Sequence, residues 1–140
     1  MEHFIIYSIN KDFKSLCKNS MLNVLYDIIT RDLQDDFYYD QLNEIVEKID
    51  KEELTCKLIE EFSLKRNFVI NDKHEFILKN NYSSHYEKLI INDNSIYIES
   101  NKTNSLFLQF ISMYYPELIV LDEVNKELKP ISLVNLAKIM

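Results

Sequence analysis

"NFVINDKHEFILKNNYSSHYEKLIINDNSIYIESN", residues 67–101, holds four short runs of β-branched, aliphatic and aromatic residues. Asn, Asp, Ser and His separate the runs. Runs of this kind predict β-strands, and the polar residues between them predict turns. Residues 90–98, "IINDNSIYI", are typical of a hairpin whose turn uses Asp93 and Asn94 in place of glycine. The stretch therefore predicts an antiparallel meander.

Different patterns precede the meander. "HFIIYSI" (3–9) predicts a buried strand. Apolar residues then recur at helical spacing and predict helices over about 12–30, 36–49 and 51–63. No Pro or Gly marks residues 49–53, so the last two helices are also compatible with one bent helix.

The residues after the meander alternate between helix and strand patterns. Residues 103–115 predict a helix that stops before Pro116, with Tyr114 in its buried stripe. "ELIVLDE" (117–123) predicts a central strand, and residues 125–128 predict a turn. The strand is expected to end at the surface with Asp122 and Glu123. A short helix capped near Ser132 is expected after Pro130.

The order of these elements indicates the α+β class. An N-terminal strand and amphipathic helices are followed by an antiparallel meander, a strand–helix–strand unit and a short C-terminal helix. A chain of 140 residues has the usual size of one domain, and no repeat or linker divides it. We therefore expect a single domain over residues 1–140.

The sequence contains no glycine, and this excludes several kinds of site. Phosphate-binding loops, dinucleotide fingerprints and nucleophile elbows all need glycine at fixed places. His74, Glu75, His85 and Glu87 lie in a predicted hairpin where strand pairing would gather them, but their spacing is not that of a zinc site. No nucleophile has a base beside it in a catalytic pattern. We therefore expect no enzyme, no metal and no cofactor.

Cysteine use and hydropathy bear on the location of the protein. Cys17 and Cys56 are the only cysteines, and the N-terminal residues lack the basic segment of a signal peptide. The longest apolar stretch without charge, 103–116, is shorter than the roughly 20 residues that span a bilayer. These features predict a soluble, cytoplasmic protein that does not bind membranes.

Charge is unevenly distributed along the chain. The net charge is −7, yet twelve acids and four bases between Asp27 and Glu61 give this segment alone −8. A field of this sign repels nucleic acid and attracts basic surfaces. We therefore expect a basic protein partner and no direct binding to nucleic acid.

"RDLQDDFYYDQ", residues 31–41, leaves two interpretations open. Acids at the start of a helix cap it and complement its dipole, which is a purely structural role. Three consecutive aromatic residues, 37–39, span about 200° of a helix, so at least one ring would be exposed, and exposed tyrosine is a common interface anchor. The predicted partner-binding residues are Asp35, Asp36, Tyr38, Tyr39, Asp40, Glu44 and Glu47.

The end of the chain, "SIYIESNKTNSLFLQFISMYYPELIVLDEVNKELKPIS" (95–132), resembles small bacterial immunity proteins of polymorphic toxin systems, of the contact-dependent inhibition type. In that pattern a strand, a helix ending in aromatic–Pro–Glu and a strand ending in Asp-Glu close an α+β domain. The resemblance implies a cytoplasmic inhibitor that blocks one toxin, often a nuclease. It carries over no binding residue, and the acidic segment has no counterpart in it.

Two functions are therefore expected. The first is a non-enzymatic acidic inhibitor, of the immunity or anti-defence type, that blocks a basic partner such as a nuclease toxin or a nucleic-acid-binding effector. The alternative is a structural or regulatory interaction module, a homodimer or assembly subunit, that uses an apolar face. A third hypothesis is an enzyme whose active site combines residues that are far apart in the sequence.

Overall fold

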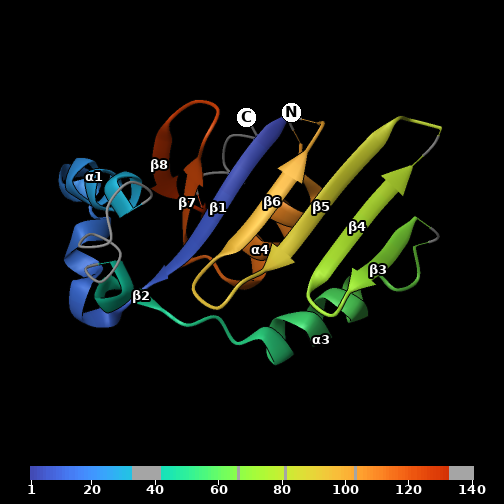
Figure 1. The fold of residues 1–140 in the computed structure, drawn as a ribbon, viewed down its shortest axis with the longest axis horizontal. Helices are drawn as coiled ribbons and strands as arrows, with labels where there is room; N and C mark the ends of the chain where they lie inside the picture. Colours follow the sequence, from blue (N-terminus) through green and yellow to red (C-terminus); the bar gives the residue numbers. More distant parts are fainter. Residues whose placement is uncertain (33–41, 66, 81, 103, 133–140) are drawn as a thin grey trace.

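An antiparallel sheet with helices on both sides forms the α+β structure of the protein, which is a computed structural model (Figure 1). The structure describes residues 1–32, 42–65, 67–80, 82–102 and 104–132. Its strands are β1 (Glu2–Ile9), β2 (Val46–Glu47), β3 (Phe68–Asp72), β4 (Glu75–Asn80), β5 (His85–Ile91), β6 (Ile96–Ser100), β7 (Ile119–Asp122) and β8 (Glu127–Pro130). Its helices are the 3-10 segments η1 (Lys11–Cys17) and η2 (Asn19–Met21), and the α-helices α1 (Leu22–Asp32), α3 (Lys51–Phe62) and α4 (Leu106–Tyr114).

The predicted meander is confirmed and supplies half of the sheet. Strands β3, β4, β5 and β6 follow one another as antiparallel neighbours. The central position next to β6 belongs to β1, which lies antiparallel to both β6 and β7. The sheet order is therefore β3-β4-β5-β6-β1-β7-β8, with β2 paired to the end of β1.

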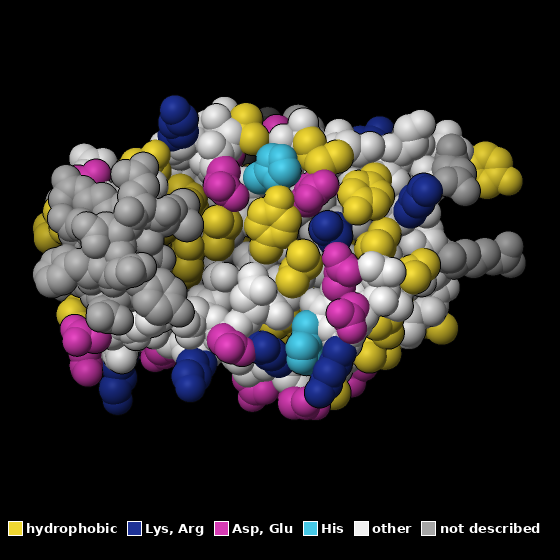
Figure 2. Space-filling view, in the orientation of Figure 1, with side chains coloured by type: hydrophobic (Ala, Val, Ile, Leu, Met, Phe, Trp, Pro, Cys, Tyr) yellow, Lys and Arg dark blue, Asp and Glu magenta, His cyan; other side chains and the backbone are white. Residues whose placement is uncertain are grey.

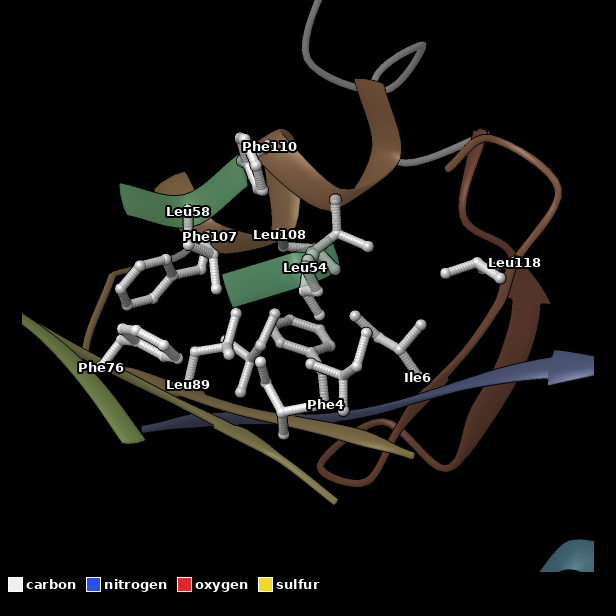
Figure 3. Close-up of a cluster of buried hydrophobic side chains, with 14 of the residues drawn as sticks. Phe4, Ile6, Leu54, Leu58, Phe76, Leu89, Phe107, Leu108, Phe110 and Leu118 are labelled. Atoms are coloured by element: carbon white, nitrogen blue, oxygen red, sulfur yellow. The ribbon is translucent and has the colours of Figure 1, made fainter. Parts of the chain in front are cut away.

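One face of the sheet is packed against α3 and α4, and we call it the helix face (Figure 3). Alternate residues of β1, β4, β5 and β6 point into this layer, because successive strand residues point to opposite sides. From α3, Leu54, Leu58 and Phe62 enter the same core. The Phe62 ring lies edge-on to Phe107 of α4, with 5.2 Å between ring centroids. Both helices are thus held by apolar contacts to the sheet.

The opposite face is covered only in part. Around β1, β7 and β8 a second core contains Tyr7, Leu121 and Leu128 of the strands with Leu25 and Ile29 of α1. Over β4, β5 and β6 no described helix lies on this side, and we call this region the open face. Figure 2 shows hydrophobic side chains along its middle, with acidic, basic and histidine side chains around them.

The helix predicted over residues 12–30 is wrong in its first half. Residues 11–21 form the 3-10 segments η1 and η2, and only α1 is α-helical. Lys18 between the 3-10 segments has extended backbone, with φ −69° and ψ 145°. The Asn10 side chain accepts the Asp12 N–H at 3.1 Å at the start of η1. Ser and Asn are weaker helix formers than the aliphatic residues, so the apolar spacing alone does not maintain an α-helix.

The helix predicted over residues 36–49 also ends early. Residues 42–45 are helical, but Val46 and Glu47 form β2 by pairing with Ile9 and Ser8 of β1. Pairing at a free strand edge outweighs the helical pattern of these two residues. The alternative of one bent helix through residues 49–53 is therefore wrong. The part of this prediction over residues 36–41 lies outside the described residues.

The turn predicted over residues 125–128 is displaced, since Glu127 begins strand β8. The turn lies between β7 and β8, where Lys126 takes a left-handed backbone with φ 54°. The Asp122 carboxylate accepts hydrogen bonds from the N–H groups of Val124 and Asn125. Asp122 is therefore buried as a turn anchor, and its expected surface position is wrong. The helix predicted after Pro130 lies largely outside the described residues.

Candidate functional site

Two of the predicted partner-binding residues are described, and both are exposed. Glu44 lies in the helical residues 42–45 and Glu47 lies in β2. Leu42 and Ile45 fix this segment by entering the second core. Glu47 accepts a hydrogen bond of 3.3 Å from Ser8 Oγ. The other predicted residues, Asp35, Asp36, Tyr38, Tyr39 and Asp40, lie outside the described residues.

Helix α3 presents further acids to solvent. Its buried residues recur at positions 54, 58 and 62, so the opposite side of the helix is polar. Glu52, Glu53, Glu60 and Glu61 are all exposed. The acidic character predicted from the sequence therefore lies on the outside of α3.

Some acids of this segment have structural partners. The Asp50 carboxylate caps α3 by accepting the Glu53 N–H at 3.1 Å. Glu53 lies 3.0 Å from Lys57 Nζ, and its hydrogen bond to Lys57 raises the pKa of that ammonium. Outside the segment, Asp93 pairs with Lys51 at 2.6 Å, and this contact lowers the pKa of Asp93. Glu53 and Asp93 are therefore paired with lysines of the chain, and Asp50 is engaged by the backbone of α3.

The remaining acids of residues 42–61 form no ion pair with any described residue. We call this set the acidic surface; it consists of Glu44, Glu47, Glu52, Glu60 and Glu61. An exposed carboxylate without an ion-pair partner keeps an uncompensated charge at the surface, which solvent and salt screen only in part at short range. These residues are therefore the part of the negative segment that remains available to another molecule.

Replacing Asp50 with alanine is expected to lower the free energy of unfolding by about 1 kcal/mol, because α3 loses its N-cap. Glu61→Ala, at an exposed and unpaired position of the same helix, is expected to change it by less than about 0.5 kcal/mol. Urea denaturation followed by circular dichroism measures both values. Equal losses in the two variants would mean that the cap does not stabilise α3.

An exposed aromatic side chain accompanies the acidic helix. Tyr114 at the end of α4 is 48% exposed, so its expected position in the buried stripe is wrong. Its ring lies 5.6 Å from Lys57 Nζ of α3, and its neighbour Met113 is also exposed. The helical spacing does not predict the exposure of Tyr114, because it does not show that α4 ends at this residue, where the helix leaves the core.

One cavity adjoins the start of α3, and a second cavity shares Ser8 and Glu117 with it in its walls. The first has a volume of about 160 Å³ and an apolar wall that includes Ile49, Leu54 and Leu118. Three carboxylates and one base also line it: Asp50, Glu53, Glu117 and Lys48. Pockets for drug-sized ligands are usually about 300–1,000 Å³, so this cavity is sized for a single side chain.

The second cavity, of about 440 Å³, sets Lys11 and Lys14 against Glu47 and Glu117. Cys17 also lines it, and partial burial raises the pKa of the thiol, although Lys14 acts in the opposite direction. A raised pKa keeps the sulfur protonated near neutral pH, which makes it a weak nucleophile. The cavity therefore offers mixed charge but no activated thiol.

Of the histidines and glutamates of the predicted hairpin, the structure brings together His85 and Glu87 but not all four residues. His85 pairs with Asn80, whereas Glu75 at the other end of β4 pairs with Ile90. Glu87 points into the protein, where its carboxylate lies 2.6 Å from His85 Nε2 and accepts Ser105 Oγ at 2.5 Å. Among the described residues there is no group of three or more potential ligands that could hold a metal ion.

The open face contains a polar cluster that the sequence did not indicate. His3 Nδ1 lies 2.6 Å from Tyr97 Oη, and Tyr97 Oη donates to Glu99 at 3.4 Å. Burial raises the pKa of Tyr97, and the neighbouring Glu99 adds to this. The alternation in "SIYIES" predicts which residues share a face of β6, but His3 joins them only through the pairing of β1 with β6.

No family model matches the chain, and no curated protein sequence is similar enough to indicate a relationship. Within the described ranges, no helix combines the length and the apolar character needed to cross a membrane. The site must therefore be interpreted from its own residues.

Proposed function

We propose that the protein is a non-enzymatic, cytoplasmic inhibitor that binds a basic protein partner through the acidic surface. The observation that carries the proposal is the exposure of every described acid between residues 42 and 61. Five of these acids form the acidic surface and have no ion-pair partner among the described residues. Negative charge that the fold does not use is available for recognition.

The chemistry of the partner follows from the sign of this charge. Lys and Arg on a partner would be attracted over long range and would pair with carboxylates at contact. Proteins that bind nucleic acid carry such basic surfaces, because they must neutralise phosphates. A nuclease toxin or another nucleic-acid-binding effector is therefore the proposed target. The resemblance of residues 95–132 to immunity proteins supports the same class.

Apolar contacts would complement the charge. Tyr114 lies next to α3 and is followed back along α4 by the exposed Met113, and tyrosine is enriched among residues that dominate binding energy. The cavity of about 160 Å³ beside α3 combines an apolar wall with carboxylates. A Lys or Arg side chain fits this combination, since its aliphatic stem packs on apolar surface while its charge stays near acids.

The double variant Glu44→Lys/Glu47→Lys is expected to weaken partner binding about tenfold or more at low salt, mainly through slower association. The control Glu123→Lys/Glu127→Lys also reverses two exposed acids, both near the β7–β8 turn, and is expected to bind normally. The partner is first captured from native cells at low and high salt and identified by mass spectrometry. Binding and inhibition of the purified partner are then measured with each variant.

Two results would contradict the proposal. The first is a captured partner that is not basic and is retained equally at high salt. The second is equal weakening by both double variants, since that would reflect net charge alone and not the acidic surface. If the partner binds but keeps its full activity, the protein is a binding module and not an inhibitor.

The second candidate function is a structural or regulatory interaction module. The observation that favours it is the open face, where Ile77, Ile90 and Tyr97 lie on β4, β5 and β6 with no described helix over them. An apolar face of this kind suits assembly with another protein or with a second copy. Measuring the oligomeric state in solution tests the version of this candidate in which two copies assemble.

A further inference from the structure

Strand β3 is an edge strand of the sheet (Figure 1). Edge strands present unpaired backbone groups, and proteins usually protect them with Lys, Pro, a bulge or a covering element. The opposite edge is protected in this way, because β8 ends at Pro130 and contacts α1. Strand β3, "FVIND", contains neither Lys nor Pro, and its protection is a register shift between Ile70 and Asp72.

The direction of the backbone groups in β3 follows from its pairing with β4. Lys79 N–H donates to Asn67 C=O at 3.0 Å, so these two residues form a hydrogen-bonded pair. In an antiparallel ladder such pairs alternate with non-hydrogen-bonded pairs. Val69 and Ile77 are therefore the next hydrogen-bonded pair, whereas Phe68 and Ile70 direct their N–H and C=O groups away from β4.

Most of these outward groups have no partner within the described part of the chain. Phe68 N–H donates to Lys65 C=O at 3.2 Å. For Phe68 C=O and for both backbone groups of Ile70, no backbone partner is found among the described residues. The free edge thus offers one donor and two acceptors within a three-residue stretch.

The side chains around this edge are apolar and accessible. Val69 is 52% exposed on the side of the open face, and Ile70 is 49% exposed on the other side. Residues 67–71, "NFVIN", contain no charge, and their order of polar and apolar residues is the same when read in either direction. Asp72 and Lys73 follow and balance each other, so residues 67–73 have no net charge, and the bases Lys65 and Arg66 precede them in a chain of net charge −7.

We propose that β3 is a self-association edge, which pairs antiparallel with β3 of a second copy around a two-fold axis at Val69. A two-fold interface requires each residue to face its symmetry partner, and the reversible pattern of residues 67–71 meets this requirement. Ile70 N–H of each copy donates to Phe68 C=O of the other. The two Val69 side chains meet on the open-face side, and Phe68 lies opposite Ile70.

A second copy is the occupant that the charges favour. Two chains of net charge −7 repel each other, and the repulsion is strongest at the acidic surface. The neutral strand region is a place where two copies can meet without this cost. The contact is small, so the association is weak and depends on concentration. The inference is independent of the acidic surface and of the proposed inhibitor function.

The test is sedimentation velocity over a concentration series, with the variant Ile70→Pro. The wild type is expected to move from 16.8 kDa toward twice that mass as the concentration rises. Ile70→Pro removes the outward N–H, which does not contribute to the β3–β4 ladder, and proline is tolerated on edge strands in this orientation. This variant is expected to stay monomeric. The control Ile70→Thr keeps the N–H and is expected to associate.

A second measurement covers the case in which Ile70→Pro fails to fold, as judged by circular dichroism. Hydrogen exchange of the wild type then reports on the Ile70 amide, which is expected to become slower with rising concentration. The Lys65 amide, which donates to Phe62 C=O within its own chain, is expected not to change. A wild type that remains monomeric at high concentration would overturn the proposal. Association of folded Ile70→Pro at wild-type strength, or an Ile70 amide insensitive to concentration, would overturn it as well.

Discussion

Replacing Glu87 with alanine is expected to lower the free energy of unfolding by about 3–5 kcal/mol. Glu87 is fully buried and anchors α4 to β5. Its carboxylate accepts hydrogen bonds from Ser105 Oγ and from the N–H groups of Leu106 and Phe107, at 2.5, 2.8 and 3.3 Å. His85 Nε2 lies 2.6 Å from the same group. The substitution leaves all of these donors without their acceptor.

The carboxylate also complements the start of α4. The first N–H groups of a helix have no partner inside the helix, and they favour a negative group at this end. Ser105 caps the same helix by accepting Leu108 N–H at 3.1 Å while it donates to Glu87. Removal of Glu87 therefore weakens the cap as well as the link between helix and sheet.

Two variants serve as controls for this prediction. Glu87→Gln keeps one acceptor oxygen and the shape of the side chain, so a smaller loss is expected. Glu99→Ala, on the open face of the neighbouring strand, is expected to cost less than about 1 kcal/mol. Urea denaturation at pH 7, followed by circular dichroism, measures all three. A loss for Glu87→Ala no larger than that for Glu99→Ala would show that the buried network does not stabilise the fold.

Replacing Leu58 with alanine is expected to cost about 2–5 kcal/mol, through lost burial and the cavity left behind. Leu58 is 0% exposed on α3 and belongs to the core between α3, α4 and the sheet (Figure 3). Its neighbour Ile59 is 38% exposed on the same helix. Ile59→Ala removes a side chain of equal size and is expected to cost under about 1 kcal/mol.

The comparison of Leu58→Ala with Ile59→Ala tests which side of α3 faces the sheet. Thermal or urea denaturation of both variants is sufficient, because the helix propensity of the two new residues is the same. A larger loss for Ile59→Ala would mean that the helix is rotated relative to the structure. The acids of α3 would then not form an outward acidic surface.

Much of the fold follows from local sequence patterns. The α+β class and the meander of β3 to β6 were predicted because alternating apolar runs and polar turns act over a few residues. Helix α3 was predicted for a similar reason, since its apolar residues recur at helical spacing. These features depend on neighbours in the chain.

Several errors occurred where residues distant in the sequence determine the structure. Val46 and Glu47 follow a helical pattern, but the edge of β1 recruits them into β2. Glu87 resembles any strand glutamate in sequence, and its role depends on Ser105, which is 18 residues away. Asp122 is buried because the glycine-free turn after it needs an acceptor. No local pattern carries this information.

The candidate site was also predictable only in part. A surplus of acids between residues 27 and 61 is a property of the sequence, and composition predicts it directly. Which acids are free depends on pairings such as Glu53 with Lys57 that follow from the fold. The free edge of β3 was beyond prediction, because the strand order places it at the margin of the sheet.

The central position of β1 has a consequence for translation. Residues 2–9 leave the ribosome long before residues 96–100 and 119–122, the strands that flank β1 in the sheet. The hairpins of β3 to β6 can form while synthesis continues, because their contacts are local. Closure of the sheet must wait until β7 has emerged, and until then β1 exposes apolar residues. Nascent chains that stall before residue 119 are therefore the form of this protein that most needs a chaperone.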